Sequence, residues 1–171
     1  DGFLDLYICN YVNWSFENHP YCDGPTPTQQ EICPPKEFEP LPDNIYYSNG
    51  DGTFYNAREF AHLTDLGKGL GVMSADYDLD GDVDIYVAND TVANFLYIND
   101  GTGQFEERGT LHSVAFDGVG NSNGSMGIDV GDYNLDGKPD IWVANYEQEA
   151  FALYRNDGQA MFTYVSDRTG V

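Results

Sequence analysis

The stretch Asp76-Tyr-Asp-Leu-Asp-Gly-Asp-Val-Asp84 places five aspartates on alternate positions around one glycine. Hard divalent cations take oxygen ligands, and a short loop can offer side-chain oxygens from its first, third, fifth and ninth positions and a carbonyl from its seventh. Gly81 stands at the sixth position, where the chain must turn sharply and a residue without Cβ tolerates positive φ. The pattern predicts a Ca²⁺ loop whose ligands are the carboxylates of Asp76, Asp78, Asp80 and Asp84 and the carbonyl of Asp82.

The same pattern returns 56 residues further along the chain. A third, partial copy is Asp1-Gly-Phe-Leu-Asp5, which matches positions five to nine of the loop. One such loop could also be a solvated Asp/Gly-rich turn without an ion, but two full copies favour calcium. We therefore expect two complete Ca²⁺ sites and an incomplete one. The second site would use Asp132, Asn134, Asp136, Asp140 and the carbonyl of Lys138, and the incomplete site Asp1, Asp5 and the carbonyl of Phe3.

These loops are not EF-hands, which need a bidentate Glu at position twelve and a helix on either side. Position twelve is Val87 in the first loop and Val143 in the second. Each loop runs directly into an apolar segment with β-branched and aromatic residues, 85–88 and 141–144, which is typical of a buried strand. The loops therefore connect strand to strand.

The composition indicates an all-β protein. The 171 residues include 19 Gly, 8 Pro and 13 Tyr, and no segment shows a sustained helical period of apolar residues. The formal net charge of −22, from 29 acidic and 7 basic residues, argues against nucleic acid or an anionic membrane surface as a partner. No apolar run reaches the roughly 18 residues that a transmembrane segment needs.

Each loop is embedded in a repeat of four short strands. A small-residue strand precedes each complete loop and begins near residue 69 or 124. Later in each repeat, a Gly-rich turn opens at Asn49, Asn99 or Asn156 and closes on Phe. Four antiparallel strands per repeat of 50 to 60 residues is typical of a β-propeller blade. The strand that follows each loop ends at Asn10, Asn89 or Asn145, and the next strand is centred on Tyr47, Tyr97 or Tyr154.

We accordingly expect one partial propeller domain, with a partial blade over residues 1–60 and complete blades over 61–115 and 116–171. Closed propellers usually have four to eight blades. The expectation is that the chain is a piece of something longer, packed against other blades of the same propeller or against other protein subunits.

An insertion over about residues 12–43 replaces the short connection of the other repeats and carries most of the prolines. Cys22 and Cys33 could brace it with a disulfide, which would imply an oxidising compartment, or could be free thiols. Cys9 aligns with Ala88 and Ala144, so we expect a small buried core residue there.

The repeats resemble the FG-GAP/VCBS repeats of integrin α-subunit propellers. The repeats are still more similar to those of the ASPIC/UnbV and cartilage acidic protein group. The similarity lies in the order of four motifs: the acidic loop, the segment ending in V-A-N, the N-x-L-Y-x-N motif and the Gly-rich turn closing on Phe. The resemblance covers nearly the whole chain. It implies a secreted propeller, commonly of seven blades, and calcium ligands at Asp76, Asp78, Asp80, Asp84, Asp132, Asn134, Asp136 and Asp140.

No catalytic motif is apparent. His19, His62 and His112 fall in unrelated places, and the Gly-rich run 118–124 has no Lys and introduces a strand, so a loop is the better interpretation. We expect a non-enzymatic, calcium-binding module for protein interaction, adhesion or structural assembly, in a secreted, extracellular or periplasmic location. The alternative is a carbohydrate-binding or polysaccharide-lyase propeller. A lyase should cluster cationic groups that neutralise uronates, and 7 scattered basic residues argue against it.

Overall fold

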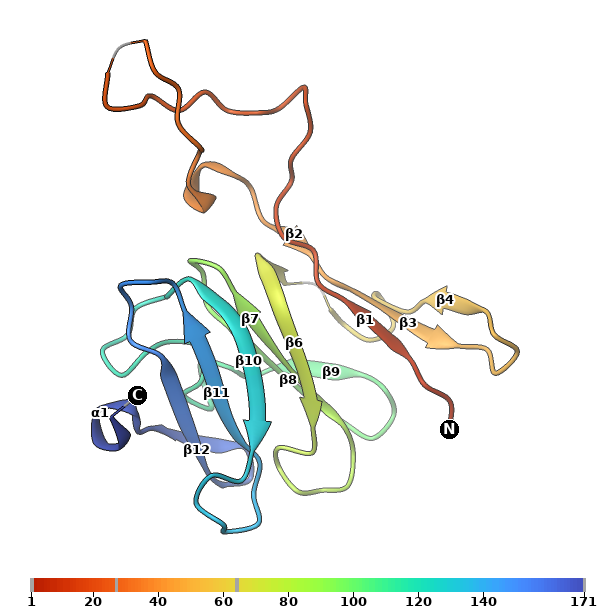
Figure 1. The fold of residues 1–171 in the computed structure, drawn as a ribbon. Coiled ribbons are helices and arrows are strands. Elements are labelled where there is room, and N and C mark those ends of the chain that lie inside the picture. Colours follow the sequence, from red (N-terminus) through yellow and green to blue (C-terminus); the bar gives the residue numbers. More distant parts are fainter. Residues whose placement is uncertain (1, 27, 64, 171) are drawn as a thin grey trace.

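The computed structural model describes residues 2–26, 28–63 and 65–170 and is built almost entirely of short antiparallel strands (Figure 1). This confirms the predicted all-β class. The elements are β1 (Leu6–Ile8), η1 (Pro35–Glu37), β2 (Leu41–Pro42), β3 (Asn44–Ser48), β4 (Phe54–Asn56), β5 (Leu66–Gly67), β6 (Gly69–Ala75), β7 (Asp84–Asn89), β8 (Phe95–Asn99), β9 (Phe105–Glu107), β10 (Ser125–Gly131), β11 (Asp140–Asn145), β12 (Ala152–Gly158), β13 (Met161–Tyr164) and α1 (Ser166–Thr169).

Two four-stranded sheets repeat the same topology, with strand orders β6-β7-β8-β9 and β10-β11-β12-β13. Their registers also correspond, because Ile85 pairs with Tyr97 in the first sheet and Ile141 pairs with Tyr154 in the second. The two inner strands, β6 and β10, lie next to each other (Figure 1). These sheets are the stacked four-stranded blades that the repeats predict.

A third sheet has three strands in the order β1-β3-β4. Here one sequence prediction was wrong by one residue. Leu6 pairs with Tyr46, so Tyr46, and not Tyr47, takes the place of Tyr97 and Tyr154. The three turns have the same length: Ser48 pairs with Phe54, Asn99 with Phe105 and Asn156 with Phe162. Ser48, and not Asn49, is therefore equivalent to the two asparagines.

Two apolar clusters fill the spaces between the sheets. One lies between the two four-stranded sheets and includes Tyr77, Tyr86, Val143 and Phe162, all nearly inaccessible to solvent. The other joins the three-stranded sheet to β7, β8 and β9 and includes Ile45, Ile85, Val87 and Phe105. Alternate residues of β7 therefore pack against opposite neighbours, which explains why this strand is buried along its whole length.

The insertion between β1 and β3 forms an arm that projects from the sheets (Figure 1). Isolated bridges between Val12 and Pro40 and between Asp23 and Gln30 make it a loose hairpin. A disulfide joins Cys22 to Cys33, as predicted. At the base, β2 pairs with β5, and the ammonium group of Lys68 donates to the carbonyl of Pro35 at 2.7 Å.

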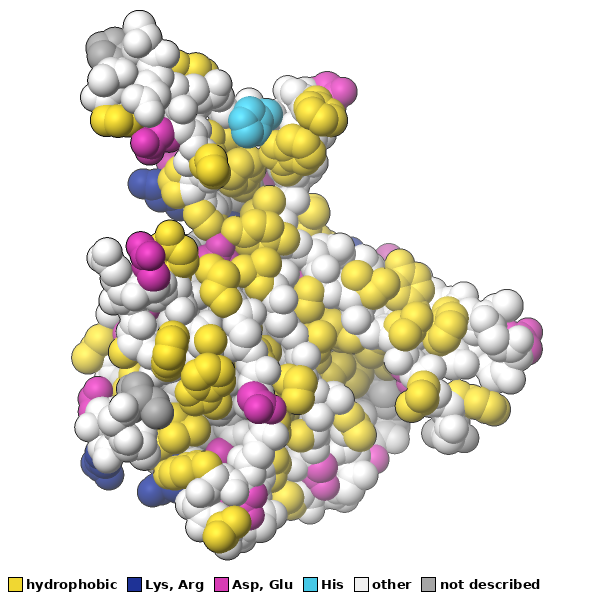
Figure 2. Space-filling model, viewed as in Figure 1, with side chains coloured by type: hydrophobic (Ala, Val, Ile, Leu, Met, Phe, Trp, Pro, Cys, Tyr) yellow, Lys and Arg dark blue, Asp and Glu magenta, His cyan; other side chains and the backbone are white. Residues whose placement is uncertain are grey.

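Cys9 has a free thiol and is half-buried, so it is less enclosed than the fully buried Ala88 that it matches in the repeat. Within the described ranges, neither helix has the length or the apolar character to cross a bilayer. Lys and Arg side chains are sparse on the face in Figure 2, where apolar groups gather on the arm and at its base.

Candidate metal centres

The first acidic loop connects β6 to β7 and gathers three carboxylates. Oxygen atoms of Asp76, Asp78 and Asp84 all lie within 4.8 Å of one another. Asp84 is completely buried, and the other two are half-buried. This donor set consists of hard oxygen atoms, which fits Ca²⁺ better than a transition metal.

Backbone N–H groups hold the rest of this loop in place. The Asp76 carboxylate accepts hydrogen bonds from the N–H of Asp80 at 3.1 Å and of Gly81 at 3.0 Å. The carboxylate of Asp80 accepts the N–H of Asp82 at 2.9 Å, and Asp80 lies outside the group of three. Gly81 has a φ of 102°, and a Cβ there would meet no atom within 4 Å, so the backbone angle and not the space requires glycine.

Asp84 is the one fully buried aspartate of this loop. Its two carboxylate oxygens accept the N–H of Tyr77 and the N–H of Asn99, both at 2.9 Å. Burial raises the pKa of Asp84 to about 6, although these two hydrogen bonds lower it. Burial also raises the pKa of Asp78. Burial therefore disfavours the charged forms of these carboxylates, a cost that a bound cation would relieve.

The second loop connects β10 to β11 and repeats these contacts. The Asp132 carboxylate accepts the N–H groups of Asp136 at 2.9 Å and of Gly137 at 2.8 Å. Asp140 accepts the N–H groups of Tyr133 at 3.1 Å and of Asn156 at 2.8 Å. The two loops thus have the same backbone framework, including a residue with positive φ before the central aspartate, Leu79 at 67° and Leu135 at 61°.

The second loop differs in charge. Asn134 stands where the first loop has Asp78, and its amide donates to Asp136 at 3.1 Å. The ammonium group of Lys138 also donates to Asp136, at 2.7 Å. The first loop has a formal charge of −5, from its five aspartates. The second loop has three aspartates and Lys138, which give −3 + 1 = −2. The second loop therefore carries less negative charge than the first.

The incomplete loop at the start of the chain is placed in the same way. The Asp5 carboxylate accepts the N–H of Ser48 at 2.8 Å, as Asp84 does from Asn99 and Asp140 from Asn156. Asp1 lies outside the described residues, and the carbonyl of Phe3 remains a predicted ligand. Among the described residues, the grouping of three acidic side chains occurs in the first loop alone.

Sequence reasoning missed the asparagines that support the loops from the neighbouring strand. Besides their N–H groups, the side chains of Asn99 and Asn156 donate to the carbonyls of Val83 and Pro139, at 3.1 and 3.2 Å. Each carbonyl directly precedes the last aspartate of a loop. Because both asparagines stand six residues before a turn-closing Phe, this shared position was the signal that could have identified them.

Two overlapping segments of the chain, residues 1–87 and 76–143, match the family model described as the FG-GAP-like repeat. The chain belongs to the FG-GAP-like repeat family. The second match begins at the first residue of the first acidic loop and ends within β11, so both complete loops are part of the family pattern. A search of curated proteins finds none that matches the chain.

Membership of the FG-GAP-like repeat family agrees with the stacked antiparallel sheets described above. Such repeats suggest a β-propeller-like module for protein interaction, often bind calcium and are generally not enzymatic. The three histidines lie apart: His19 in the arm, His62 in the turn after β4 and His112 in the turn after β9.

Proposed function

We propose that this protein is a calcium-stabilised, non-enzymatic protein-interaction module of an extracellular β-propeller. The convergence of Asp76, Asp78 and Asp84 within 4.8 Å carries the proposal. Such a group brings like charges together with few cations nearby to offset them, and a bound Ca²⁺ would remove that cost and hold the turn rigid.

The ligands proposed for the first loop are the carboxylates of Asp76, Asp78, Asp80 and Asp84 and the carbonyl of Asp82. A Cβ on Gly101 would lie 2.7 Å from a carboxylate oxygen of Asp82, so this side chain points toward the neighbouring turn. That position supports a role through the carbonyl. In the second loop we propose Asp132, Asn134, Asp136, Asp140 and the carbonyl of Lys138, and for an incomplete third site Asp1, Asp5 and the carbonyl of Phe3.

The disulfide between Cys22 and Cys33 supports an extracellular or periplasmic location, because such bonds persist in oxidising compartments. The similarity of the repeats to the ASPIC/UnbV and cartilage acidic protein group supports the same location. We propose further propeller blades or protein subunits as partners, whereas the strongly acidic chain argues against nucleic acid.

Terbium luminescence tests the calcium proposal, since Tb³⁺ replaces Ca²⁺ at oxygen sites and is excited by nearby tyrosine. Tyr77 and Tyr133 each follow the first aspartate of a loop, so both loops should give a signal. We expect two classes of site that calcium displaces, the tighter lost in Asp80→Ala and the weaker in Asp136→Ala. Emission that is unchanged in the double variant would refute the assignment.

A further inference from the structure

One buried asparagine contacts both complete acidic loops. The side-chain amide of Asn156 donates to the carbonyl of Tyr77 in the first loop at 2.7 Å. The backbone N–H of Asn156 donates to a carboxylate oxygen of Asp140 in the second loop at 2.8 Å. Its amide also donates to the carbonyl of Pro139, directly before that aspartate, at 3.2 Å. Asn156 therefore bonds to two loops that belong to different sheets.

The contact reaches the far side of the first loop through a single residue. The N–H of Tyr77 donates to the carboxylate of Asp84 at 2.9 Å, and the carbonyl of Tyr77 accepts the amide of Asn156. This carbonyl also accepts the N–H of Ala160 at 3.2 Å, so the hairpin β12-β13 holds it with two donors. Two hydrogen bonds and one residue thus separate the carboxylate of Asp84 from Asn156.

The groups in this series of contacts are tightly enclosed. Tyr77, Asp84 and Asn156 are completely inaccessible to solvent. Asp140 is only 1% exposed, and the ring of Tyr77 lies edge-on to Phe162 with the centroids 6.1 Å apart. Close-packed interiors have low compressibility and transmit displacements. A change in the position of one buried carboxylate should therefore be accompanied by a change at the other.

Asp84 and Asp140 are the last carboxylate ligands proposed for their loops. A cation that binds one loop must first bring the connected groups into the arrangement that suits coordination. When a first ligand has met such a cost, a second ligand binds more tightly, which is positive cooperativity. The shared contact through Asn156 predicts this relation between the two loops.

We infer that Asn156 is a positioning residue shared by the two complete acidic loops, and that through it they bind Ca²⁺ cooperatively. An ion in either loop strengthens binding in the other by the same factor, as the linkage of equilibrium affinities requires. The inference rests on the proposed calcium function. It adds a dependence of each site on the other, which the ligands of a single loop do not require.

Asn99 is the residue equivalent to Asn156 in the sheet β6-β7-β8-β9. Its N–H donates to the carboxylate of Asp84 at 2.9 Å, and its amide donates to the carbonyl of Val83 at 3.1 Å. Both contacts lie within the repeat that contains the first loop. Asn99 thus supports this loop without connecting it to the second.

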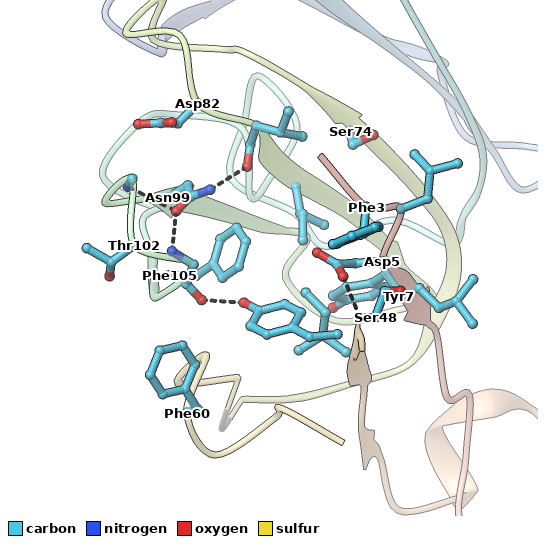
Figure 3. A pocket seen from close by; sticks show the side chains of 18 of the residues that line it. Phe3, Asp5, Tyr7, Ser48, Phe60, Ser74, Asp82, Asn99, Thr102 and Phe105 are labelled. Atoms are coloured by element: carbon cyan, nitrogen blue, oxygen red, sulfur yellow. Dashed lines mark hydrogen bonds between the residues drawn. The ribbon is translucent and has the colours of Figure 1, made fainter. Parts of the chain in front are cut away.

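A cavity of about 890 Å³ lies beside Asn99, between the three-stranded sheet and the sheet β6-β7-β8-β9. Figure 3 shows Asn99 and Phe105 on one side of it and Asp5 and Tyr7 on the other. Among the described residues, the side chain of Asn99 bonds only to groups on its own side. Replacement of Asn99 should therefore affect the first loop alone, which makes it the matched control.

Titration calorimetry of the 171-residue protein with Ca²⁺ tests the inference. Asp136→Ala leaves the first loop to bind alone, and Asp80→Ala leaves the second. For independent loops, the product of these two association constants equals the product of the two stepwise constants of the unmodified protein. We expect the stepwise product to be at least about fivefold larger, because coupling between linked sites is typically 5- to 150-fold.

The same three titrations are repeated in two further backgrounds. In Asn156→Ala the ratio of the two products should fall below about twofold, because the contact between the loops is lost. In Asn99→Ala the first loop should bind more weakly, but the ratio should stay that of the unmodified protein. A uniform loss of affinity cancels in the ratio, so the ratio separates positioning from a general structural role.

A second measurement leaves Asn156 in place and does not depend on the folding of its variant. In ¹H–¹⁵N spectra of Asp136→Ala, Ca²⁺ that binds the first loop should shift the side-chain amide and the backbone N–H of Asn156. The amide of Asn18, which donates to Asn13 in the arm at 3.0 Å, should not move. This control detects a nonspecific response to the salt.

Three results would overturn the inference and leave the calcium proposal intact: a ratio of one in the unmodified protein, an unchanged ratio in Asn156→Ala, or Asn156 resonances that ignore calcium in the first loop. An unmodified protein that shows neither binding heat nor spectral shifts with Ca²⁺ would refute the calcium proposal itself, and the inference with it.

Discussion

The side-chain amide of Asn156 donates to the backbone carbonyl of Tyr77 across 2.7 Å and joins two sheets. Asn156 is completely buried on β12, whereas Tyr77 belongs to the acidic loop between β6 and β7. The first acidic loop, a candidate cation site, is thereby connected to the hairpin β12-β13 of the next sheet. Stability of the loop and packing of the sheets should therefore depend on each other.

Asn156→Ala should lower the free energy of unfolding by about 1–3 kcal/mol, because the carbonyl of Tyr77 loses one of its two donors and that of Pro139 loses the side-chain amide. Asn99→Ala is the matched control, since its amide donates to Val83 alone among the described residues. Urea unfolding of both variants measures the difference. Equal losses would show that the contact to Tyr77 contributes little.

Asp80→Ala should cost more stability in millimolar calcium than in chelator. A ligand that binds only the folded state stabilises it by RT ln(1 + [L]/Kd), so loss of a ligating group removes part of that stabilisation. Thermal melts in both buffers provide the measurement. The control, Asp167→Ala at an exposed position of α1, should behave alike in both, and the same behaviour in Asp80→Ala would argue against calcium at this loop.

The contribution of Asp84 to stability should respond to pH with opposite sign in the two buffers. Burial raises the pKa of Asp84 to about 6, above the value of about 3.9 in an unfolded chain. Without metal, the folded state binds more protons than the unfolded state between roughly pH 4 and 6, so acidification through this window stabilises it through Asp84. With calcium, the same protonation competes with the ion and destabilises.

Urea midpoints at pH 7.5 and 5.0, with calcium and with chelator, test this expectation. In Asp84→Asn the contribution of this group should disappear from both series. A wild-type protein and an Asp84→Asn variant with identical pH dependence in chelator would show that Asp84 titrates normally.

Gly71→Ala should destabilise the protein by about 1–3 kcal/mol, whereas Gly127→Ala should change stability by less than about 1 kcal/mol. The two glycines occupy equivalent places in β6 and β10, opposite Ala88 and Ala144. A Cβ on Gly71 would meet the carbonyl of Met126 at 3.2 Å, but on Gly127 it would meet only Ala144, at 3.7 Å. Denaturant unfolding of the pair measures this, and the reverse order would contradict the close approach of β6 to β10.

Peptide mapping without reductant should recover Cys22 and Cys33 as one linked pair and Cys9 as a free thiol. Burial raises the pKa of Cys9 to about 12, so iodoacetamide should modify it slowly in the folded protein and rapidly in urea. Three free thiols before any reduction would remove the disulfide and with it the main support for an oxidising compartment.

Much of this protein follows from local sequence. The acidic loops around Gly81 and Gly137 specify the turns, because each combines regularly spaced carboxylates with a glycine at positive φ. The apolar runs after them predict β7 and β11, and recurrence of the pattern predicts the four-stranded sheets. These features depend on neighbouring residues along the chain, so pattern and period suffice to recognise them.

Other features were decided only by the tertiary structure. Because Tyr46 and Tyr47 are adjacent, the sequence does not show which of them is equivalent to Tyr97. The pairing of β3 with β1 shows that it is Tyr46. The contact between Asn156 and Tyr77 joins residues 79 positions apart, and no local pattern records such a pair. The cavity beside Phe105 arises from how whole sheets stack, because ring faces are assigned to neighbours only once the strands have paired.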